Sequence, residues 1–248
     1  MVGLDPQERL VFPLDVAGVK EAVSWVQKLS PFVGVFKIGL ELFVASGPKV
    51  VERVRKAGAK KIFLDLKFCD IPNTVAGAVR SASELGVDWI TVHTLSGEGA
   101  LKKAVENAYN NLKIVAVTIL TSLDRADLMQ LGFYGELARD PRELAFRLGS
   151  LAVNSGCDGI VCSAREVARI KEAFPQVFTV VPGIRLEEND KKRDDQLRTA
   201  TPYEAILSGA DYLVVGRPVR EAENPEAVCQ EILNQVEAAL KERNKESQ

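Results

Sequence analysis

The sequence predicts an α/β protein built as a (β/α)8 barrel, in one domain that covers residues 1–248. Two observations lead to this prediction. Short apolar runs alternate with helical patterns along the whole chain, and eight such units fit its length. No stretch rich in Gly, Ser or Pro divides the chain in two. A doubly wound open sheet is the alternative, although that fold seldom needs eight regular units.

The predicted strands are runs of apolar residues bounded by charged or turn-forming residues. In chain order they are Leu10–Asp15, Val33–Gly39, Lys61–Lys67, Trp89–His93, Ile114–Leu120, Gly159–Cys162, Phe178–Ile184 and Tyr212–Gly216.

Helical patterns follow these runs. They extend to about Leu29, from Leu40 to about Ala57, over Asn73–Leu85, from near Gly97 to near Tyr109, to about Asn154 after a longer insertion at Thr121–Gly135, over Ala164–Phe174, over Pro202–Leu207, and from Pro225 to about Lys241. We expect the tail Glu242–Gln248 to fray.

Composition limits the classes of function. Hydrophobic residues make up 46% of the chain, which supports a sizeable core, and the net charge of −2 gives no general attraction to nucleic acid or to an acidic membrane. No apolar run is long enough to span a bilayer. The N-terminal residues lack a signal-peptide pattern, so we expect a cytoplasmic protein.

The cysteines and the single histidine do not form a metal-binding pattern. Cys69, Cys157, Cys162 and Cys229 include no Cys-x-x-Cys pair, and we expect all four to be buried, inert thiols. One histidine and scattered cysteines make a zinc site improbable. We interpret His93 as structural.

Charged residues end three successive predicted strands. Asp15 ends the first strand, and Lys37 lies near the end of the second. Asp65 and Lys67 end the third. Catalytic residues of such barrels lie at the carboxyl ends of the strands, so we expect these side chains to share one site. For each residue alone, a surface charge or a helix cap is the alternative, and Asp15 could cap the helix after it.

The third strand carries most of this charge. Side chains two apart on a strand point the same way, so Asp65 and Lys67 share a face, with Phe63 below them. Asp70 follows just past the strand end. Two carboxylates this close oppose each other by about 4 kcal/mol at 4 Å and an effective dielectric near 20. The cluster therefore indicates a functional site, and a salt-bridged strand end on a solvated surface is the alternative.

Residues 65–74 read Asp-Leu-Lys-Phe-Cys-Asp-Ile-Pro-Asn-Thr. This stretch resembles the signature of the orotidine 5'-phosphate decarboxylase family, whose members are TIM barrels. The whole match is specific, whereas the shorter Asp-x-Lys-x-x-Asp is shared with related sugar-phosphate barrels. The resemblance implies loss of CO2 from C6 of orotidine 5'-monophosphate to give UMP, with no cofactor and no metal.

The resemblance also implies roles for the charged residues. Lys67 stabilises the carbanion at C6 and delivers the proton, and Asp65 lies near the departing carboxylate. Asp70 completes an alternating charge network with Lys37, Asp65 and Lys67, and it comes from the other subunit of a homodimer. Thr74 also crosses that interface. The implied substrate-binding residues on these segments are Asp15 and Lys37 at the ribose hydroxyls, together with Asp65, Ile71 and Thr74.

The ends of the seventh and eighth strands indicate a phosphate site. These strands end in Gly183-Ile184-Arg185 and in Gly216-Arg217. Glycine lets the backbone approach an anion, arginine offers a bidentate fork, and TIM barrels often bind phosphate at these two loops. An arginine paired with surface acids is the alternative at either place. The resemblance places the phosphate on Arg185, Gly216 and Arg217.

Two further segments have implied ligand contacts. Thr121 and Ser122 follow the fifth strand, and the resemblance implies that one or both of them contact the edge of the pyrimidine, although an ordinary Ser/Thr turn is the alternative. The charged run at 185–196 has the composition of a solvated, mobile loop. The resemblance makes it a loop that closes over the ligand, with Gln196 linking phosphate and pyrimidine.

Two other functions compete with the decarboxylase. One is a magnesium-dependent enzyme of the 3-keto-gulonate-phosphate decarboxylase or hexulose-phosphate synthase type, which would carry an acidic metal ligand where Lys37 stands. Lys37 and the run Ile71–Thr74 argue against that class. The other is a nucleotide-binding barrel without catalysis, which the intact set of Asp65, Lys67 and Asp70 makes improbable.

Overall fold

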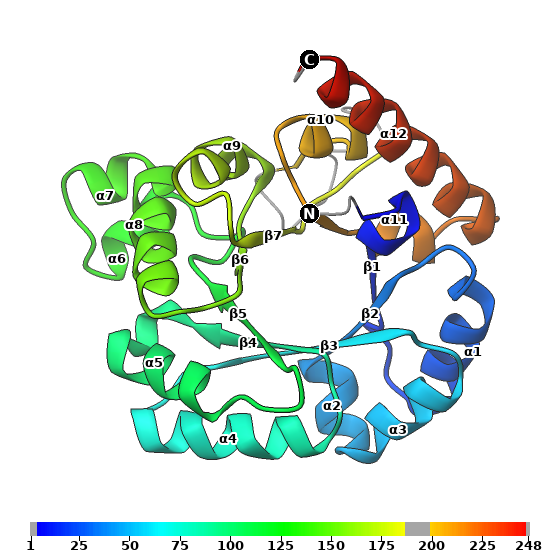
Figure 1. Cartoon of the computed structure of the whole chain (residues 1–248), viewed down its shortest axis with the longest axis horizontal. Helices are drawn as coiled ribbons and strands as arrows, with labels where there is room; N and C mark the ends of the chain where they lie inside the picture. The colour runs from blue at the N-terminus through cyan, green and yellow to red at the C-terminus, as the bar shows by residue number, and fades with distance from the viewer. Residues whose placement is uncertain (1–3, 187–198, 247–248) are drawn as a thin grey trace.

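The computed structural model describes residues 4–186 and 199–246. Its strands form a closed parallel barrel in chain order, each pairing with the next and the last pairing with the first (Figure 1). The strands are β1 (Leu10–Pro13), β2 (Val35–Gly39), β3 (Lys61–Phe68), β4 (Trp89–His93), β5 (Lys113–Val117), β6 (Gly159–Val161), β7 (Phe178–Val181) and β8 (Tyr212–Val214). The predicted (β/α)8 barrel is confirmed.

Several strands are shorter than predicted at the carboxyl end. The fifth was expected to reach Leu120 and ends at Val117, and the seventh was expected to reach Ile184 and ends at Val181. The chain stays buried after it leaves the sheet, as at Ile119 and Ile184. Hydrophobicity therefore continues past the end of these strands, and residues just beyond β5 and β7 line the mouth of the barrel.

Helices surround the barrel (Figure 1). They are η1 (Pro6–Arg9), α1 (Val19–Leu29), α2 (Leu40–Ser46), α3 (Lys49–Lys56), α4 (Pro72–Glu84), η2 (Thr94–Ser96), α5 (Glu98–Asn107), α6 (Arg125–Gln130), α7 (Glu136–Arg139), α8 (Pro141–Asn154), α9 (Ala164–Ala173), α10 (Pro202–Leu207), α11 (Arg217–Arg220) and α12 (Pro225–Glu246). None of those in the described residues is long and apolar enough to cross a membrane.

Three helix predictions are wrong. The helix expected from after Gly135 to about Asn154 is divided at Asp140 into α7 and α8. The single helix expected over Leu40–Ala57 is broken into α2 and α3, because Gly47 has a φ of +65° and the next residue is a proline, which has no N–H to continue the helix. The expected fraying is also wrong over Glu242–Glu246, since α12 continues to Glu246. There Arg243 Nη1 donates to the carbonyl of Ile206 at 3.0 Å, which holds this end of α12 against α10. The last two residues of the expected tail lie outside the described residues.

The core has two main layers. Alternate strand residues such as Ile62 and Ile90 face the outer helices. The inward residues fill the amino-terminal end of the barrel, where the Trp89 ring lies 5.6 Å from Phe63, 5.1 Å from Phe178 and 4.6 Å from Tyr212, measured between centroids. This aromatic plug closes one end of the barrel, so a ligand can enter only from the carboxyl ends of the strands.

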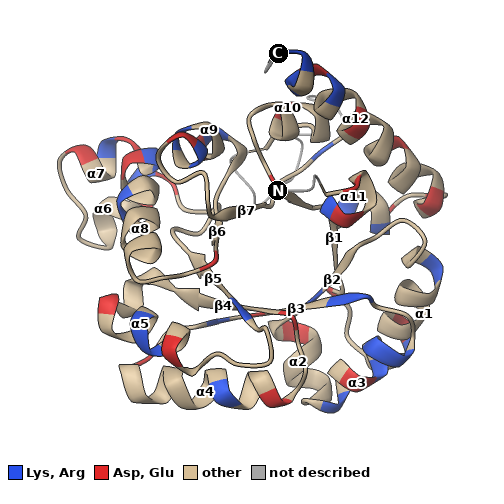
Figure 2. Cartoon of the chain, in the orientation of Figure 1, with Lys and Arg blue, Asp and Glu red and all other residues tan. Residues whose placement is uncertain are grey.

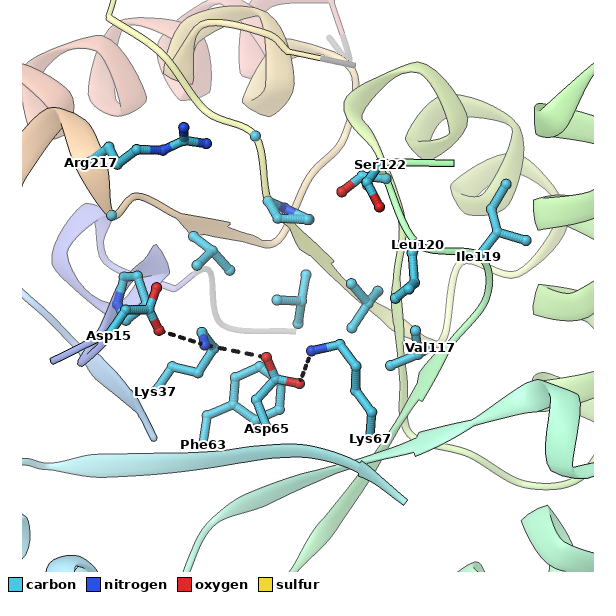
Figure 3. Close-up of a pocket in the computed structure, with 18 of the residues that line it drawn as sticks. Asp15, Lys37, Phe63, Asp65, Lys67, Val117, Ile119, Leu120, Ser122 and Arg217 are labelled. Carbon is cyan, nitrogen blue, oxygen red and sulfur yellow. Dashed lines mark hydrogen bonds and ion pairs between the residues drawn. The ribbon is translucent and has the colours of Figure 1, made fainter. Parts of the chain in front are cut away.

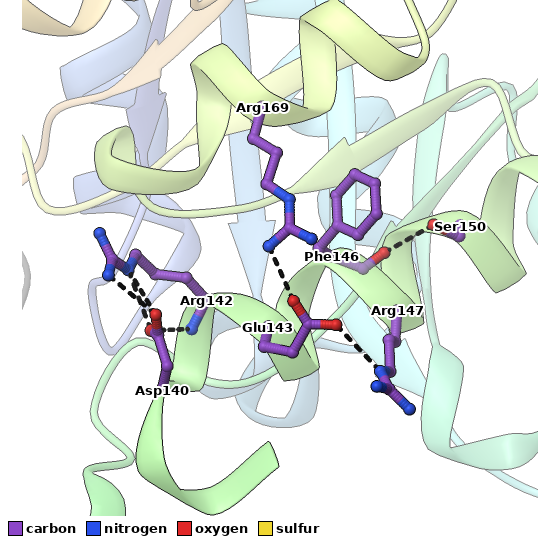
Figure 4. A network of polar contacts seen from close by, with 7 residues as sticks. All are labelled: Asp140, Arg142, Glu143, Phe146, Arg147, Ser150 and Arg169. Atoms are coloured by element: carbon purple, nitrogen blue, oxygen red, sulfur yellow. Dashed lines mark hydrogen bonds and ion pairs between the residues drawn. The ribbon is translucent and has the colours of Figure 1, made fainter. Parts of the chain in front are cut away.

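Charge on the outside is mixed. In the view of Figure 2, basic and acidic residues are interspersed over the outer helices. One network braces α8 against α9, where Glu143 accepts from Arg147 at 3.0 Å and from Arg169 at 2.9 Å, and Arg169 lies 3.9 Å from the centroid of the Phe146 ring (Figure 4). Because its acidic group is paired on both sides, we interpret this network as structural.

Candidate active site

A cavity of about 620 Å³ opens at the carboxyl ends of the strands. Its floor is apolar and includes Phe63, Val117 and Val180, which continue the inward faces of β3, β5 and β7. Its walls carry charge. Asp15, Lys37, Asp65 and Lys67 form one side, and Arg217 lies across the cavity from Lys67 (Figure 3). Arg185 and Arg220 also line the cavity, and Arg220 lies against Asp15. The barrel thus gathers residues far apart in sequence around one apolar floor.

Four of the predicted residues form a chain of alternating charge along β1, β2 and β3. Lys37 Nζ lies 3.4 Å from Asp15 Oδ1 and 3.3 Å from Asp65 Oδ2. Lys67 Nζ lies 2.9 Å from Asp65 Oδ1 (Figure 3). Each carboxylate and each ammonium therefore has an opposite charge beside it, which offsets the cost of taking these groups out of water.

Asp65 lies at the centre of this chain and is 8% exposed. Burial alone would raise the pKa of its carboxyl, but the ammonium groups of Lys37 and Lys67 outweigh burial and hold that pKa below its ordinary value. Burial would likewise lower the pKa of Lys37, and Asp65 and Asp15 hold it above its ordinary value. Asp65 and Lys37 are therefore both charged at neutral pH.

The predicted residues Asp70, Ile71 and Thr74 are exposed and lie outside the cavity lining within the described part of this chain. Asp70 Oδ1 accepts a hydrogen bond from the N–H of Ile71 at 2.6 Å, which fixes the turn between β3 and α4. The contribution of Asp70 and Thr74 to a site in another subunit stays a prediction.

The predicted pyrimidine-edge and phosphate residues do line the cavity. Thr121 and Ser122 follow β5 on one wall, and Arg217 lies across the cavity from Lys67 (Figure 3). Arg185 is buried, and its Nη1 donates to the carbonyl of Ile184 at 2.7 Å. Gln196 lies outside the described residues.

Gly216 is required by close approach of the chain. A Cβ at this position would lie 2.9 Å from Cγ of Pro13, so a side chain here would clash with β1. The glycine leaves the backbone at the start of α11 open to the cavity, beside Arg217. This geometry suits contact between the backbone and an anion.

Sequence reasoning missed Arg220. Its Nη1 donates to the backbone carbonyl of Asp15 at 3.0 Å, and its side chain lines the cavity. The residue lies one turn after Arg217 in α11, a helix that was not predicted. The sequence signal that could have identified it is the spacing of Arg217 and Arg220, three positions apart after the eighth strand.

The histidine and the cysteines do not join the charged chain. The Nδ1 atom of His93 accepts the N–H of Leu95 at 3.3 Å, and burial, with a smaller effect of Lys67, lowers its pKa. Cys157, Cys162 and Cys229 are buried as predicted, but Cys69 is exposed, because it follows the last residue of β3 in the turn toward α4. That part of the cysteine prediction is wrong.

The donor set does not suit a metal. The described residues contain no group of three His, Cys, Asp or Glu side chains placed to hold one. Between the carboxylates of Asp15 and Asp65, the position open to a cation is taken by the Lys37 ammonium.

Comparisons with known proteins agree on one family. The model of the Orotidine 5'-phosphate decarboxylase / HUMPS family matches residues 8–232. The chain is 42% identical over 238 residues to the Orotidine 5'-phosphate decarboxylase of Desulfosudis oleivorans, covering 95% of this chain and 96% of the relative. It is 44% identical over 230 residues to that of Anaeromyxobacter sp. (strain K), covering 92% and 98%. The crystal structure of Orotidine 5'-phosphate decarboxylase from Lactobacillus acidophilus matches with a TM-score of 0.77 at 32% identity, covering 92% of this chain and 98% of that one.

The charged chain predicts how stability depends on pH. Asp65→Asn leaves Lys37 and Lys67 without their shared counter-charge, which should lower the free energy of unfolding by about 3 kcal/mol near neutral pH. The folded-state pKa of Asp65 is lowered, so its contribution is present above the ordinary value of 3.8 and is lost as pH falls through the folded pKa. The pKa of Lys37 is raised, so its contribution is present below 10.5 and is lost as pH rises through the folded pKa.

Urea unfolding of the wild type and the variant across this range measures the difference. The difference in unfolding free energy between the two proteins should be constant between the titration of Asp65 and that of Lys37, and it should become smaller in acid. Asp140→Asn, which removes an exposed partner of Arg142 on the outer network, is the control and should cost much less. A difference between Asp65→Asn and wild type that persists unchanged in strong acid contradicts the assignment.

Proposed function

The chain belongs to the Orotidine 5'-phosphate decarboxylase / HUMPS family, and from that premise we propose that it converts orotidine 5'-monophosphate to UMP and CO2. The family model alone spans two chemistries. The relatives that are 42% and 44% identical over nearly their whole length are named for the decarboxylase. The observation that supports the decarboxylase in this chain is the position of Lys37, whose ammonium group lies between Asp15 and Asp65 where the sugar-phosphate class would carry an acidic metal ligand.

The cavity accommodates the substrate in one direction. The phosphate binds at the arginine end, at Arg185, Arg217 and the open backbone of Gly216. The ribose then lies beside Asp15 and Lys37, and the pyrimidine lies between the apolar floor and the Thr121–Ser122 segment. This orientation directs C6 of the base toward Asp65 and Lys67, at the opposite end from the phosphate.

The reaction at C6 needs a group that stabilises a carbanion and then protonates it. The bond between C6 and the carboxylate breaks, CO2 leaves, and the electron pair remains on C6. The Lys67 ammonium stabilises this charge and gives it a proton, and the resulting amine takes a proton back from solvent. Asp65 keeps Lys67 in place at 2.9 Å and lies beside the departing carboxylate.

We further propose that the active unit is a homodimer. Leu40 and Val44 on α2, Ile71 before α4 and Leu95 in η2 are each more than half exposed, and they follow the neighbouring strands β2, β3 and β4. A cluster of large apolar side chains on one edge of the mouth suits burial against a second copy. Asp70 lies next to Ile71 on this edge, which supports its donation, with Thr74, to the partner's site.

The setting of the reaction is part of the same proposal. Cys69 is an exposed free thiol, and Cys157 and Cys229 are also free, which suits a reducing compartment such as the cytoplasm. The net charge of −2 gives no reason to propose a nucleic-acid or membrane partner.

The direct test is an ultraviolet absorbance assay of purified protein with orotidine 5'-monophosphate. Because the site supplies its cations as Lys37 and Lys67, we expect full activity after exhaustive chelation. Lys67→Ala should be nearly inactive. Loss of activity on chelation, restored by magnesium, would instead support the metal-dependent sugar-phosphate class.

Phosphate anchoring predicts a selective effect of Arg217→Ala. Losing one charge-assisted anchor should cost about 1.5–3 kcal/mol of binding, or about 10- to 150-fold in kcat/KM on orotidine 5'-monophosphate. Slow turnover of orotidine, which lacks the phosphate, should barely change. Arg142→Ala, an exposed arginine on α8, is the matched control and should leave both reactions unchanged. Equal loss on the two substrates would show that Arg217 supports the fold or the chemistry.

A shared site predicts complementation between two inactive variants. Lys67→Ala and Asp70→Ala homodimers should each be nearly inactive. A mixed dimer holds one intact site and one doubly damaged site, so random exchange should restore roughly a quarter of wild-type activity. The two variants are unfolded, mixed and refolded, with each alone as control. If mixed dimers are confirmed by mass and remain inactive, Asp70 acts in its own chain's site.

A further inference from the structure

Thr91 lies directly behind the charged chain without lining the cavity. It is in the middle of β4 and is 1% exposed. Trp89, two residues earlier, belongs to the inward layer, whereas Ile90 and Val92 face the outer helices. The Thr91 side chain therefore points into the barrel, above the aromatic plug and below the mouth. A side chain in this place lies outside the cavity lining, but it can fix the residues that form that lining.

The strand that Thr91 faces is irregular at Lys67. Phe63 pairs with Trp89 and Leu64 pairs with Ile90, but the next pair joins Phe68 to Val92, so β3 has two more residues than β4 over this interval. Lys67 lies in this bulge with a φ of +51°, a left-handed conformation that is uncommon for a residue with a side chain. Surrounding contacts must hold such a conformation in place.

The Thr91 hydroxyl supplies those contacts. Its Oγ1 accepts the backbone N–H of Lys67 at 2.7 Å, which replaces the strand partner that the bulge removes. The same hydroxyl donates to Asp65 Oδ1 at 3.0 Å. Asp65 Oδ1 in turn accepts from Lys67 Nζ at 2.9 Å. One hydroxyl thus holds the backbone of Lys67 directly and its ammonium group through Asp65.

We propose that Thr91 is a positioning residue for the decarboxylation, fixing the bulged backbone of Lys67 and the Asp65 carboxylate in one geometry. The inference rests on the proposed function, because it concerns the same lysine and the same step. It adds a residue that contacts no reacting atom. Proton delivery to C6 depends on where Lys67 Nζ lies, and small displacements of such a group cost large factors in rate.

The titration of the Asp65 carboxyl gives a second measure of the role of Thr91. Its carboxylate is faced by Lys37 from β2, by Lys67 from β3 and by the Thr91 hydroxyl from β4, with Asp15 beyond Lys37. His93, further along β4, carries no counter-charge for it at neutral pH, since its pKa is lowered. Thr91 is the neutral donor in this set, so its removal weakens the hold on the ionised carboxylate without removing a charge.

The test compares three variants with the wild type. Thr91→Val keeps the shape of the side chain and removes the hydroxyl, whereas Thr91→Ser keeps the hydroxyl. Thr179→Val is the matched control, because Thr179 is also buried but lies at the opposite end of the barrel. Its hydroxyl accepts the backbone N–H of Asp211 at 3.1 Å and donates to Asp211 Oδ2 at 3.3 Å. The measurements are kcat and KM on orotidine 5'-monophosphate, the melting temperature, and NMR titration of the Asp65 carboxyl.

Thr91→Val should lower kcat by about 10- to 100-fold with little change in KM, and the carboxyl titration of Asp65 should move to higher pH. Thr91→Ser should recover most of the activity. Thr179→Val should lower the melting temperature as much as Thr91→Val and leave kcat unchanged. Wild-type kcat in Thr91→Val, or an equal loss of kcat in Thr91→Ser, would overturn the inference.

A failure of the proposed function is distinguishable from a failure of this inference. If the wild type does not decarboxylate orotidine 5'-monophosphate, the proposed function fails, and the titration of Asp65 in the unliganded protein still decides the role of Thr91. An Asp65 titration that is the same in the wild type and in Thr91→Val then overturns that role. A shift to higher pH that Thr91→Ser reverses supports it.

Discussion

The pairing of Asp65 with two lysines is the interaction on which the site depends. A buried carboxylate is stable only where opposite charge lies against it, and here Lys37 and Lys67 lie 3.3 and 2.9 Å away. The two lysines come from β2 and β3, so the pairing exists only if these strands are adjacent and end together. The parallel pairing of β2 with β3 meets that requirement, and the aromatic plug around Trp89 closes the opposite end of the barrel.

The barrel also separates binding from chemistry. Arg185 and Arg217 follow β7 and β8, whereas the charged chain lies on β2 and β3 and just after β1, and Arg217 lies across the cavity from Lys67 (Figure 3). On the proposed function, a ligand that spans this distance would be held at its phosphate end by groups remote from Lys67. Binding energy from that phosphate would then organise the site without stabilising the ground state at C6.

Much of this was predictable from the sequence, for identifiable reasons. Strand order and the cluster of Asp15, Lys37, Asp65 and Lys67 follow from apolar runs that end in charge. The predicted strands were too long at their carboxyl ends, because residues such as Ile119 stay buried after the chain leaves the sheet. The bulge at Lys67 is invisible to a rule of simple alternation. Thr91 was missed because threonine is common in strands for its β-propensity alone, so its presence there indicates no function. Its role appears only when β3 and β4 lie side by side.

The aromatic plug has an optical consequence. The chain has two tryptophans, and Trp89 is buried at the base of the barrel, against Phe63, whose ring also forms part of the cavity floor. Trp25 instead lies on α1, beside Phe12. The intrinsic fluorescence of Trp89 therefore arises one contact below the cavity. The residue that seals the barrel is also a built-in spectroscopic reporter of how the floor is arranged.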